Sequence, residues 1–108
     1  MIKNFENNDF SWVNELNIAI TVSDLEDNII YMNEKSKSTF PNVSIGDNLR
    51  NCHKKSSNEI IQKMRNENLS NTYTVQKDGI KKIIHIVPWY MEGKVAGLVE
   101  FSIEELQP

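Results

Sequence analysis

The side chains best suited to chemistry are two neighbours, Cys52 and His53. Cys52 is the only cysteine of the chain, and His53 is one of its two histidines. A thiolate and an imidazole can bind zinc or heme iron, and a thiolate can react with oxidants. A structural zinc site needs four ligands, and no second pair accompanies this one. Two interpretations therefore stay open: a redox or ligand contact, or simply the start of the helix that follows.

The sequence offers no enzyme signature. It contains no G-x-S-x-G, P-loop, H-E-x-x-H or G-x-G-x-x-G motif. An acid–base pair without an activated nucleophile is weak ground for catalysis. We therefore expect a protein that is not an enzyme, with no catalytic residue and no metal site.

Size and composition restrict the class of protein further. The chain has 108 residues, of which 39% are hydrophobic and 25% charged, as expected for one globular domain. The net charge of −3 argues against a nucleic-acid surface. No apolar run is long enough to cross a bilayer, and no secretory signal opens the chain. A single cysteine fits a reducing compartment, so we expect a cytoplasmic protein without nucleic-acid or membrane partners.

The first two thirds of the sequence combine short helices with two strands. The stretch NDFSWVNEL predicts an amphipathic helix with Trp12, Val13 and Leu16 on one side. IAITVSD and NIIYMN predict strands joined by a polar turn. Asn33 is placed to cap a helix that Pro41 ends. SSNEIIQKMRNENL predicts the longest helix, which opens with a capping box.

The last third predicts three strands joined by two tight turns. Asp78-Gly79 suits a two-residue hairpin loop, and Glu92-Gly93 is a weaker example of the same device. The order of elements therefore predicts an α+β fold, with one antiparallel sheet and helices gathered on one face.

The two turns predict a register, and the register predicts two sheet faces. In this register His85 pairs with Glu100 and Ile86 with Val99. One face is almost wholly apolar: Tyr73, Val75, Ile84, Ile86, Pro88, Tyr90, Val99, Phe101 and Ile103. The other is mixed: Thr72, Thr74, Ile83, His85, Val87, Trp89, Leu98, Glu100 and Ser102. Periodicity alone would bury the apolar face and leave His85–Glu100 as a weak surface pair.

The order of these segments resembles a PAS domain. The resemblance lies in NIAITVSDLEDNIIYMNEKSKSTF, in GDNLRNCHKKSS and in GLVEFSIEE, and it covers roughly residues 14 to 105. Short single-domain PAS proteins of anaerobic bacteria are especially similar. The resemblance implies a five-stranded sheet in the order 2-1-5-4-3, with helices on one face and a pocket between them. It divides the chain into an N-terminal helical extension, residues 1–16, and a PAS-like domain, residues 17–108.

The resemblance also implies which residues face the pocket. Counting back from Glu104 and Asp24, the inward residues are Ser102, Glu100, Ser23 and Thr21, so the mixed face becomes the pocket wall. His85 and Glu100 would then hold a ligand by charge-assisted hydrogen bonds, or form a pair that only satisfies itself. The hydroxyls would contact the ligand or the backbone. The complete set of ligand-binding candidates is His85, Glu100, Thr21, Ser23, Ser102, Trp89, Met64, Cys52 and His53.

The apolar face, extended by Ile18, Ile20 and Val22, would form the back of the sheet. A patch of that size needs a cover, which we expect from the N-terminal helix and a second subunit. Three functions follow, in order of preference. The first is a homodimeric sensory module that binds a small polar ligand and acts on a protein partner. The second is an interaction adaptor whose pocket is filled by its own side chains. The third is a heme or flavin sensor, although the sequence requires no cofactor.

Overall fold

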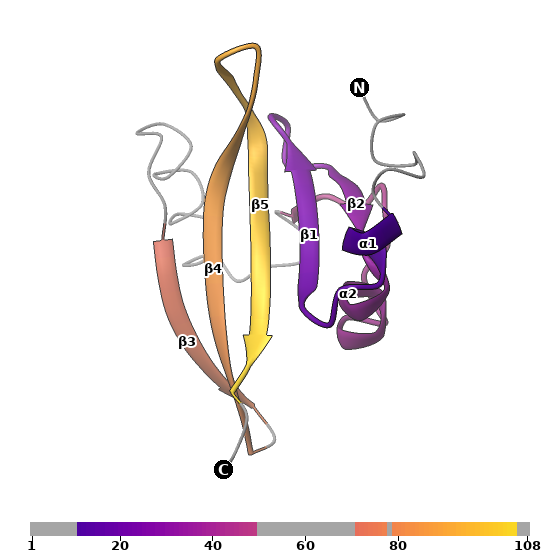
Figure 1. The fold of residues 1–108 in the computed structure, drawn as a ribbon, viewed down its shortest axis with the longest axis vertical. Helices are drawn as coiled ribbons and strands as arrows, with labels where there is room; N and C mark the ends of the chain where they lie inside the picture. The colour runs from indigo at the N-terminus through magenta and orange to yellow at the C-terminus, as the bar shows by residue number, and fades with distance from the viewer. Residues whose placement is uncertain (1–10, 50–70, 78, 106–108) are drawn as a thin grey trace.

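A computed structural model describes residues 11–49, 71–77 and 79–105 of the chain. Five antiparallel strands form one sheet in the order β2-β1-β5-β4-β3, and both short helices lie at its β1–β2 end (Figure 1). This confirms the predicted α+β class and strand order. The helix predicted from SSNEIIQKMRNENL lies outside the described residues. The elements are α1 (Ser11–Asn14), β1 (Ala19–Asp24), β2 (Ile29–Met32), α2 (Glu34–Thr39), β3 (Asn71–Lys77), β4 (Ile80–Met91) and β5 (Lys94–Glu104).

The turn between β1 and β2 is organised by the side chain of Asp24. Its Oδ1 accepts hydrogen bonds from the backbone N–H groups of Glu26 and Asn28, each at 2.9 Å. Asp27 takes a positive φ of 68° within this turn. Asp tolerates that conformation better than most residues, so local chemistry explains why the chain reverses here.

Asn33 begins α2, as predicted. Its side chain accepts a hydrogen bond from the Ser36 N–H, the standard contact of an N-cap residue. The helix ends at Thr39, and Phe40 is its C-cap, one residue before Pro41.

The strands of both predicted hairpins pair with each other. Strands β3 and β4 pair in the predicted register, with Lys77 opposite Ile80 and Tyr73 opposite Ile84. At the second turn Glu92 and Gly93 have φ angles of 52° and 79°, as a type I′ loop requires. Next to that turn, the predicted pairing of Tyr90 with Val95 is confirmed.

Beyond that pair the predicted β4–β5 register is wrong. Tyr90 pairs with Val95, but Trp89 pairs with Gly97, so Ala96 is an extra residue in β5. Such a β-bulge shifts all later pairs by one residue and reverses which side chains share a face. His85 therefore pairs with Phe101, and Ile86 with Glu100.

Gly97 accounts for the position of the bulge. A Cβ atom built at Gly97 would overlap the backbone carbonyl of Ser23 on β1 and lie 2.7 Å from Nε1 of Trp89. The same Nε1 donates a 2.9 Å hydrogen bond to the Ser23 carbonyl oxygen. The bulge therefore stands where β4, β5 and β1 approach closely, which only a residue without a side chain permits.

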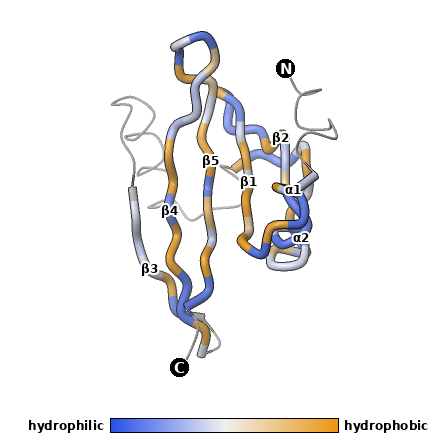
Figure 2. Tube along the Cα trace, in the orientation of Figure 1, coloured by the Kyte–Doolittle hydropathy of each residue, from blue (hydrophilic) through white to orange (hydrophobic). Residues whose placement is uncertain are grey.

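The sheet has two distinct faces, and both polar and apolar residues lie along β4 and β5 (Figure 2). We call the face that packs against α2 the inner face. It carries Thr21, Ser23, Tyr73, Ile84, Ile86, Leu98, Glu100 and Ser102. The opposite, outer face carries Ile20, Val22, Thr72, Ile83, His85, Val87, Trp89, Val99, Phe101 and Ile103. The predicted faces were correct for β1 and β5, but the assignment of β3 and β4 relative to them was wrong because of the bulge.

Helix α1 covers only part of the outer face. Val13 and Leu16 pack against the cluster of Ile20 and Val22 from β1 and Tyr31 from β2. The sequence predicted that Trp12 lies on the same side of the helix as Val13 and Leu16. Instead Trp12 is 67% exposed and is not part of this cluster. Farther along the outer face, Ile83 and Ile103 pair with each other, and each is 37% exposed.

Candidate functional site

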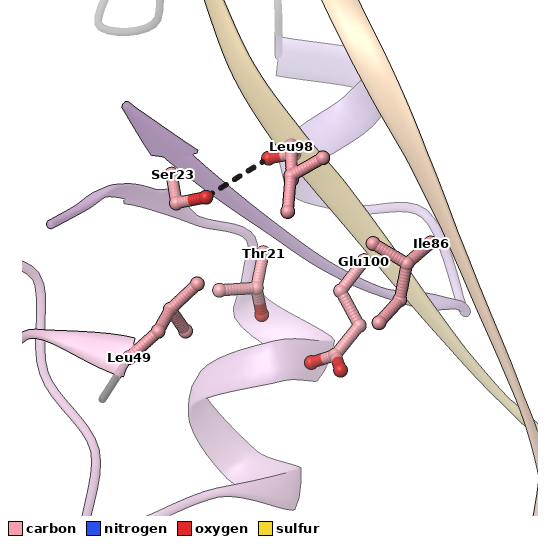
Figure 3. A pocket seen from close by; sticks show the side chains of 6 residues that line it. All are labelled: Thr21, Ser23, Leu49, Ile86, Leu98 and Glu100. Atoms are coloured by element: carbon pink, nitrogen blue, oxygen red, sulfur yellow. Dashed lines mark hydrogen bonds between the residues drawn. The ribbon is translucent and has the colours of Figure 1, made fainter. Parts of the chain in front are cut away.

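A small pocket lies on the inner face, between the sheet and the segment that follows α2. Thr21 and Ser23 contribute from β1, Ile86 from β4, and Leu98 and Glu100 from β5, while Leu49 closes the other side (Figure 3). Thr21 and Glu100 are direct cross-strand partners. The walls are thus mainly apolar, with a carboxylate and two hydroxyls, a composition typical of small-molecule sites.

Glu100 is the charged group of this pocket. Its side chain is partly buried and points from β5 toward the helical layer (Figure 3). Tyr73 packs beside it, against the cluster of Ile84, Ile86 and Leu98. Burial, and secondly the negative charge of Glu100, raise the pKa of the Tyr73 hydroxyl to about 12. The phenol therefore stays protonated at neutral pH.

The hydroxyls of the inner face differ in their partners. Oγ1 of Thr21 forms a 2.6 Å hydrogen bond with Oγ of Ser36 on α2. Oγ of Ser23 donates to the Leu98 carbonyl oxygen at 3.4 Å (Figure 3). Ser102 is only 4% exposed, and its buried hydroxyl has no partner among the described residues. A buried hydroxyl without a hydrogen bond lowers the stability of the folded state, so of these three hydroxyls that of Ser102 would gain most from a hydrogen bond to a bound molecule.

The pocket is narrow. Its free volume is about 10 Å³, which is enough for about one water molecule. A ligand larger than that must move side chains of the wall, such as Leu49 or Ile86.

Two predicted pocket residues lie on the wrong face. His85 is on the outer face, where its Nδ1 forms a hydrogen bond with Oγ1 of Thr72, so its predicted pairing with Glu100 is wrong. Trp89 also belongs to the outer face and packs against the cluster around Ile20 and Val22. Both errors have the same physical cause, the extra residue in β5.

The other candidates divide into two groups. Thr21, Ser23, Glu100 and Ser102 all lie on the inner face, as the family resemblance implied. Whether they bind a ligand stays a prediction. Cys52, His53 and Met64 lie outside the described residues. Within the described ranges, no three His, Cys, Asp or Glu side chains are placed to hold a metal ion, and no helix is long and apolar enough to span a membrane.

Sequence reasoning missed Ile86 as a wall of the pocket, and Tyr73 and Ile84 as its neighbours on the inner face. Tyr73, Ile84 and Ile86 were assigned to the back of the sheet. The hairpin predicted from the Asp78-Gly79 sequence put Tyr73 opposite Ile84, and the structure has this pairing, so the local signal was present. Only the bulge at Ala96 brings that pair onto the same face as Glu100.

Comparison with solved structures identifies the fold. The PAS domain of a protein from Colwellia psychrerythraea matches with a TM-score of 0.63 and 24% identity, over 87% of this chain and 91% of that one. A sensory box sensor histidine kinase from Vibrio cholerae matches with a TM-score of 0.64 and 13% identity, over 88% and 87% of the two chains.

A third match is a heme protein by its description. The Aer2 receptor of Vibrio cholerae, a dual PAS-heme oxygen sensor, matches with a TM-score of 0.63 and 15% identity, over 82% of this chain and 95% of that one. No protein-family model and no curated protein matches the chain. At these identities the likeness concerns the fold alone: the chain has the PAS fold.

Proposed function

We propose that the protein is a non-enzymatic sensory module of the cytoplasm that binds a small polar molecule at the inner-face pocket. One observation carries the proposal. Glu100 lines the pocket, and Ser102, two residues farther along β5 on the same inner face, has a buried hydroxyl without a described partner. Natural cores rarely keep such a hydroxyl unsatisfied, so a ligand or water that the fold admits is its natural partner.

The polar groups of the pocket favour a ligand that donates hydrogen bonds. An ionised carboxylate only accepts, and it repels other anions at short range. Tyr73 stays neutral beside Glu100 and adds a hydroxyl to the same face. Leu49, Ile86 and Leu98 supply the apolar walls. The proposed ligand is therefore small and neutral or cationic, with an N–H or O–H group for Glu100 and an apolar body.

Signalling is proposed to run through the outer face. Ile83 and Ile103 are exposed there, and Trp12 of α1 is exposed as well. Apolar side chains of this size are typical of subunit contacts, so we propose that a second copy of the chain covers them. Sedimentation of wild type should give a dimer, and Ile83→Glu should give a monomer. A monomeric wild type would contradict this part of the proposal.

One observation favours a second function, an adaptor whose pocket stays filled by its own side chains. The free volume of about 10 Å³ leaves little room for a ligand without rearrangement. In that case the inner face is only a core, and partner binding alone carries the function. A heme or flavin sensor would involve Cys52 or His53 and would make the purified protein coloured.

Thermal melting with matched ligand pairs separates these functions. We would melt the full chain with small amines and with carboxylic acids of the same carbon skeleton, such as benzylamine and benzoate. A ligand at 100 times its Kd stabilises the folded state by roughly 2.7 kcal/mol. The proposal predicts a higher melting temperature with members of the amine series only.

Two variants control this experiment. Glu100→Gln removes the pocket charge and should abolish the preference for amines. Glu26→Gln removes an exposed carboxylate in the β1–β2 turn and should leave the preference intact. Stabilisation by the carboxylic acids instead would overturn the ligand class. No response to either series would favour the adaptor.

A further inference from the structure

The side-chain amide of Asn33 joins three parts of the molecule. Asn33 is completely buried. Its Oδ1 accepts from the backbone N–H of Ser36 on α2 at 3.0 Å and from that of Ile20 on β1 at 2.9 Å. Its Nδ2 donates toward carbonyl oxygens of the N-terminal segment, those of Val13 at 3.0 Å, Ile18 at 2.8 Å and Leu16 at 3.5 Å.

Helix capping alone does not explain an asparagine at this position. Asp and Ser cap helices about as well as Asn, because only a side-chain oxygen is needed. The amide differs from them by its two N–H donors. Here both halves of the amide are used: the oxygen starts α2, and the nitrogen holds the α1 segment.

The same network reaches the pocket. Ser36, whose N–H is capped by Asn33, forms the 2.6 Å hydroxyl contact with Thr21. Thr21 lines the pocket and is the cross-strand partner of Glu100. A continuous chain of buried hydrogen bonds thus leads from the pocket wall through Ser36 and Asn33 to the carbonyl groups of α1 and the segment after it.

Helix α1 is suited to respond to changes in this hydrogen-bond network. It contains four residues, far too few for a helix to be stable by itself in water. Its position depends on the contacts of Val13 and Leu16 with the outer face and on the hydrogen bonds from Asn33. Local opening of such a segment needs much less free energy than global unfolding.

We propose that Asn33 is a positioning residue that couples the inner-face pocket to the docking of α1. A ligand that engages Thr21 changes the Thr21–Ser36 contact and so moves the first turn of α2. Asn33 follows, because its oxygen is bonded to that turn, and its nitrogen then holds or releases the N-terminal segment. This inference deepens the proposed function and rests on it for the identity of the input. The coupling itself is a property of the chain that can be measured without a ligand.

Hydrogen exchange of the full chain, read on peptides that cover residues 11–18, tests the coupling. Asn33→Asp keeps the acceptor oxygen for Ser36 and Ile20 but replaces the donor nitrogen by an oxygen that faces carbonyl groups. We expect exchange in this segment to rise about ten-fold or more. Thr21→Val removes only the hydroxyl contact with Ser36 and should raise exchange about five-fold.

The double variant decides between coupling and independent effects. If the path runs through Asn33, adding Thr21→Val to Asn33→Asp causes no further increase, because α1 is already disconnected. Ser38→Ala, which removes an exposed hydroxyl of α2 bonded only to the Lys35 carbonyl, should leave exchange unchanged. Equal effects of Thr21→Val in both backgrounds, or no effect at all, would overturn the inference.

A second pair of variants protects the test if Asn33→Asp does not fold. Thr21→Val and Ser36→Ala break the same hydroxyl contact from its two ends and leave the cap in place. Each should raise exchange in residues 11–18, and the double variant should exceed neither. Additive effects, or unchanged exchange, would contradict the coupling. Failure to find a ligand would refute the proposed function and leave these results standing, so the two claims fail separately.

Discussion

Two buried serines on opposite sides of the same interface differ in how their hydroxyls are satisfied. Ser36 on α2 is fully buried, and its hydroxyl contacts Thr21 while its N–H is capped by Asn33. Ser102 on β5 is 4% exposed, and its hydroxyl has no partner among the described residues. In the scaffold formed by β1, β2 and α2, the buried polar groups around Ser36 are thus hydrogen-bonded to one another. In the ribbon formed by β4 and β5, the Ser102 hydroxyl on the inner face can still form a hydrogen bond. The contrast separates residues that build the fold from residues available to a ligand.

The largest effect is expected at the junction of the two regions, from Gly97→Ala. The added Cβ would overlap the Ser23 carbonyl and crowd Nε1 of Trp89, so β1 and β5 would have to separate. We expect a loss of about 4 kcal/mol in the free energy of unfolding, measured by urea denaturation. A loss below about 1 kcal/mol would show that the strands can adjust, and that the bulge is not fixed by this approach.

Asn33→Ala tests the scaffold itself. The change removes the N-cap of α2 and leaves buried N–H and carbonyl groups on β1 and the α1 segment without their partner. We expect a loss of about 3 kcal/mol in the free energy of unfolding, measured in the same way. The control variant Ser38→Ala changes an exposed polar residue of α2, and its free energy of unfolding should stay within about 0.5 kcal/mol of wild type.

The raised pKa of Tyr73 predicts that the stability of the folded state depends on pH in the alkaline range. Its pKa in the folded state is raised to about 12 from 10.0, first by burial and then by Glu100. The folded state therefore holds its proton where the unfolded state loses it. The resulting stability is fully present below pH 10 and is lost as the pH rises through about 12.

Tyr73→Phe should remove this alkaline loss of stability, measured by denaturation at several pH values. Glu100→Gln should lower the pKa of Tyr73, followed by the ultraviolet absorbance of phenolate. An unchanged pKa in Glu100→Gln would mean that burial alone is responsible.

The smallest changes in the free energy of unfolding are expected for alanine variants of the two serines, and their signs should distinguish Ser36 from Ser102. Ser36→Ala removes a satisfied hydroxyl and should cost about 1.5 kcal/mol. Ser102→Ala removes an unsatisfied one and should be neutral or stabilising by up to about 1 kcal/mol. Equal costs for both variants would contradict the distinction between scaffold and site.

Local sequence signals predicted most of the fold because local chemistry sets it. The cap at Asn33, the pairing of β3 with β4 and the turn at Glu92-Gly93 each depend on residues close in sequence, and they formed as predicted. The bulge at Ala96 depends on Gly97 meeting β1, more than 70 residues away in sequence, which no local pattern shows.

The candidate site inherited this division. The inward positions on β1 and β5, which include Thr21 and Glu100, were predicted from the family resemblance and lie on the inner face. The positions on β3 and β4 were assigned to the wrong face because of the one-residue shift. His85 was therefore wrongly predicted to face the pocket, and Tyr73 was wrongly predicted to lie on the back of the sheet. The role of Asn33 beyond capping was also missed, because the carbonyl groups that its nitrogen contacts are set by tertiary packing.

The most direct test of the central claim, that the inner face binds a small molecule, is mass spectrometry of the purified full chain, first native and then denatured. If the inner face binds a small molecule, the native mass should exceed that of whole subunits, a small molecule should be released on denaturation, and the excess should be lost in Glu100→Gln. A native mass equal to whole subunits, with nothing released and nothing taken up from the amine series, would contradict it.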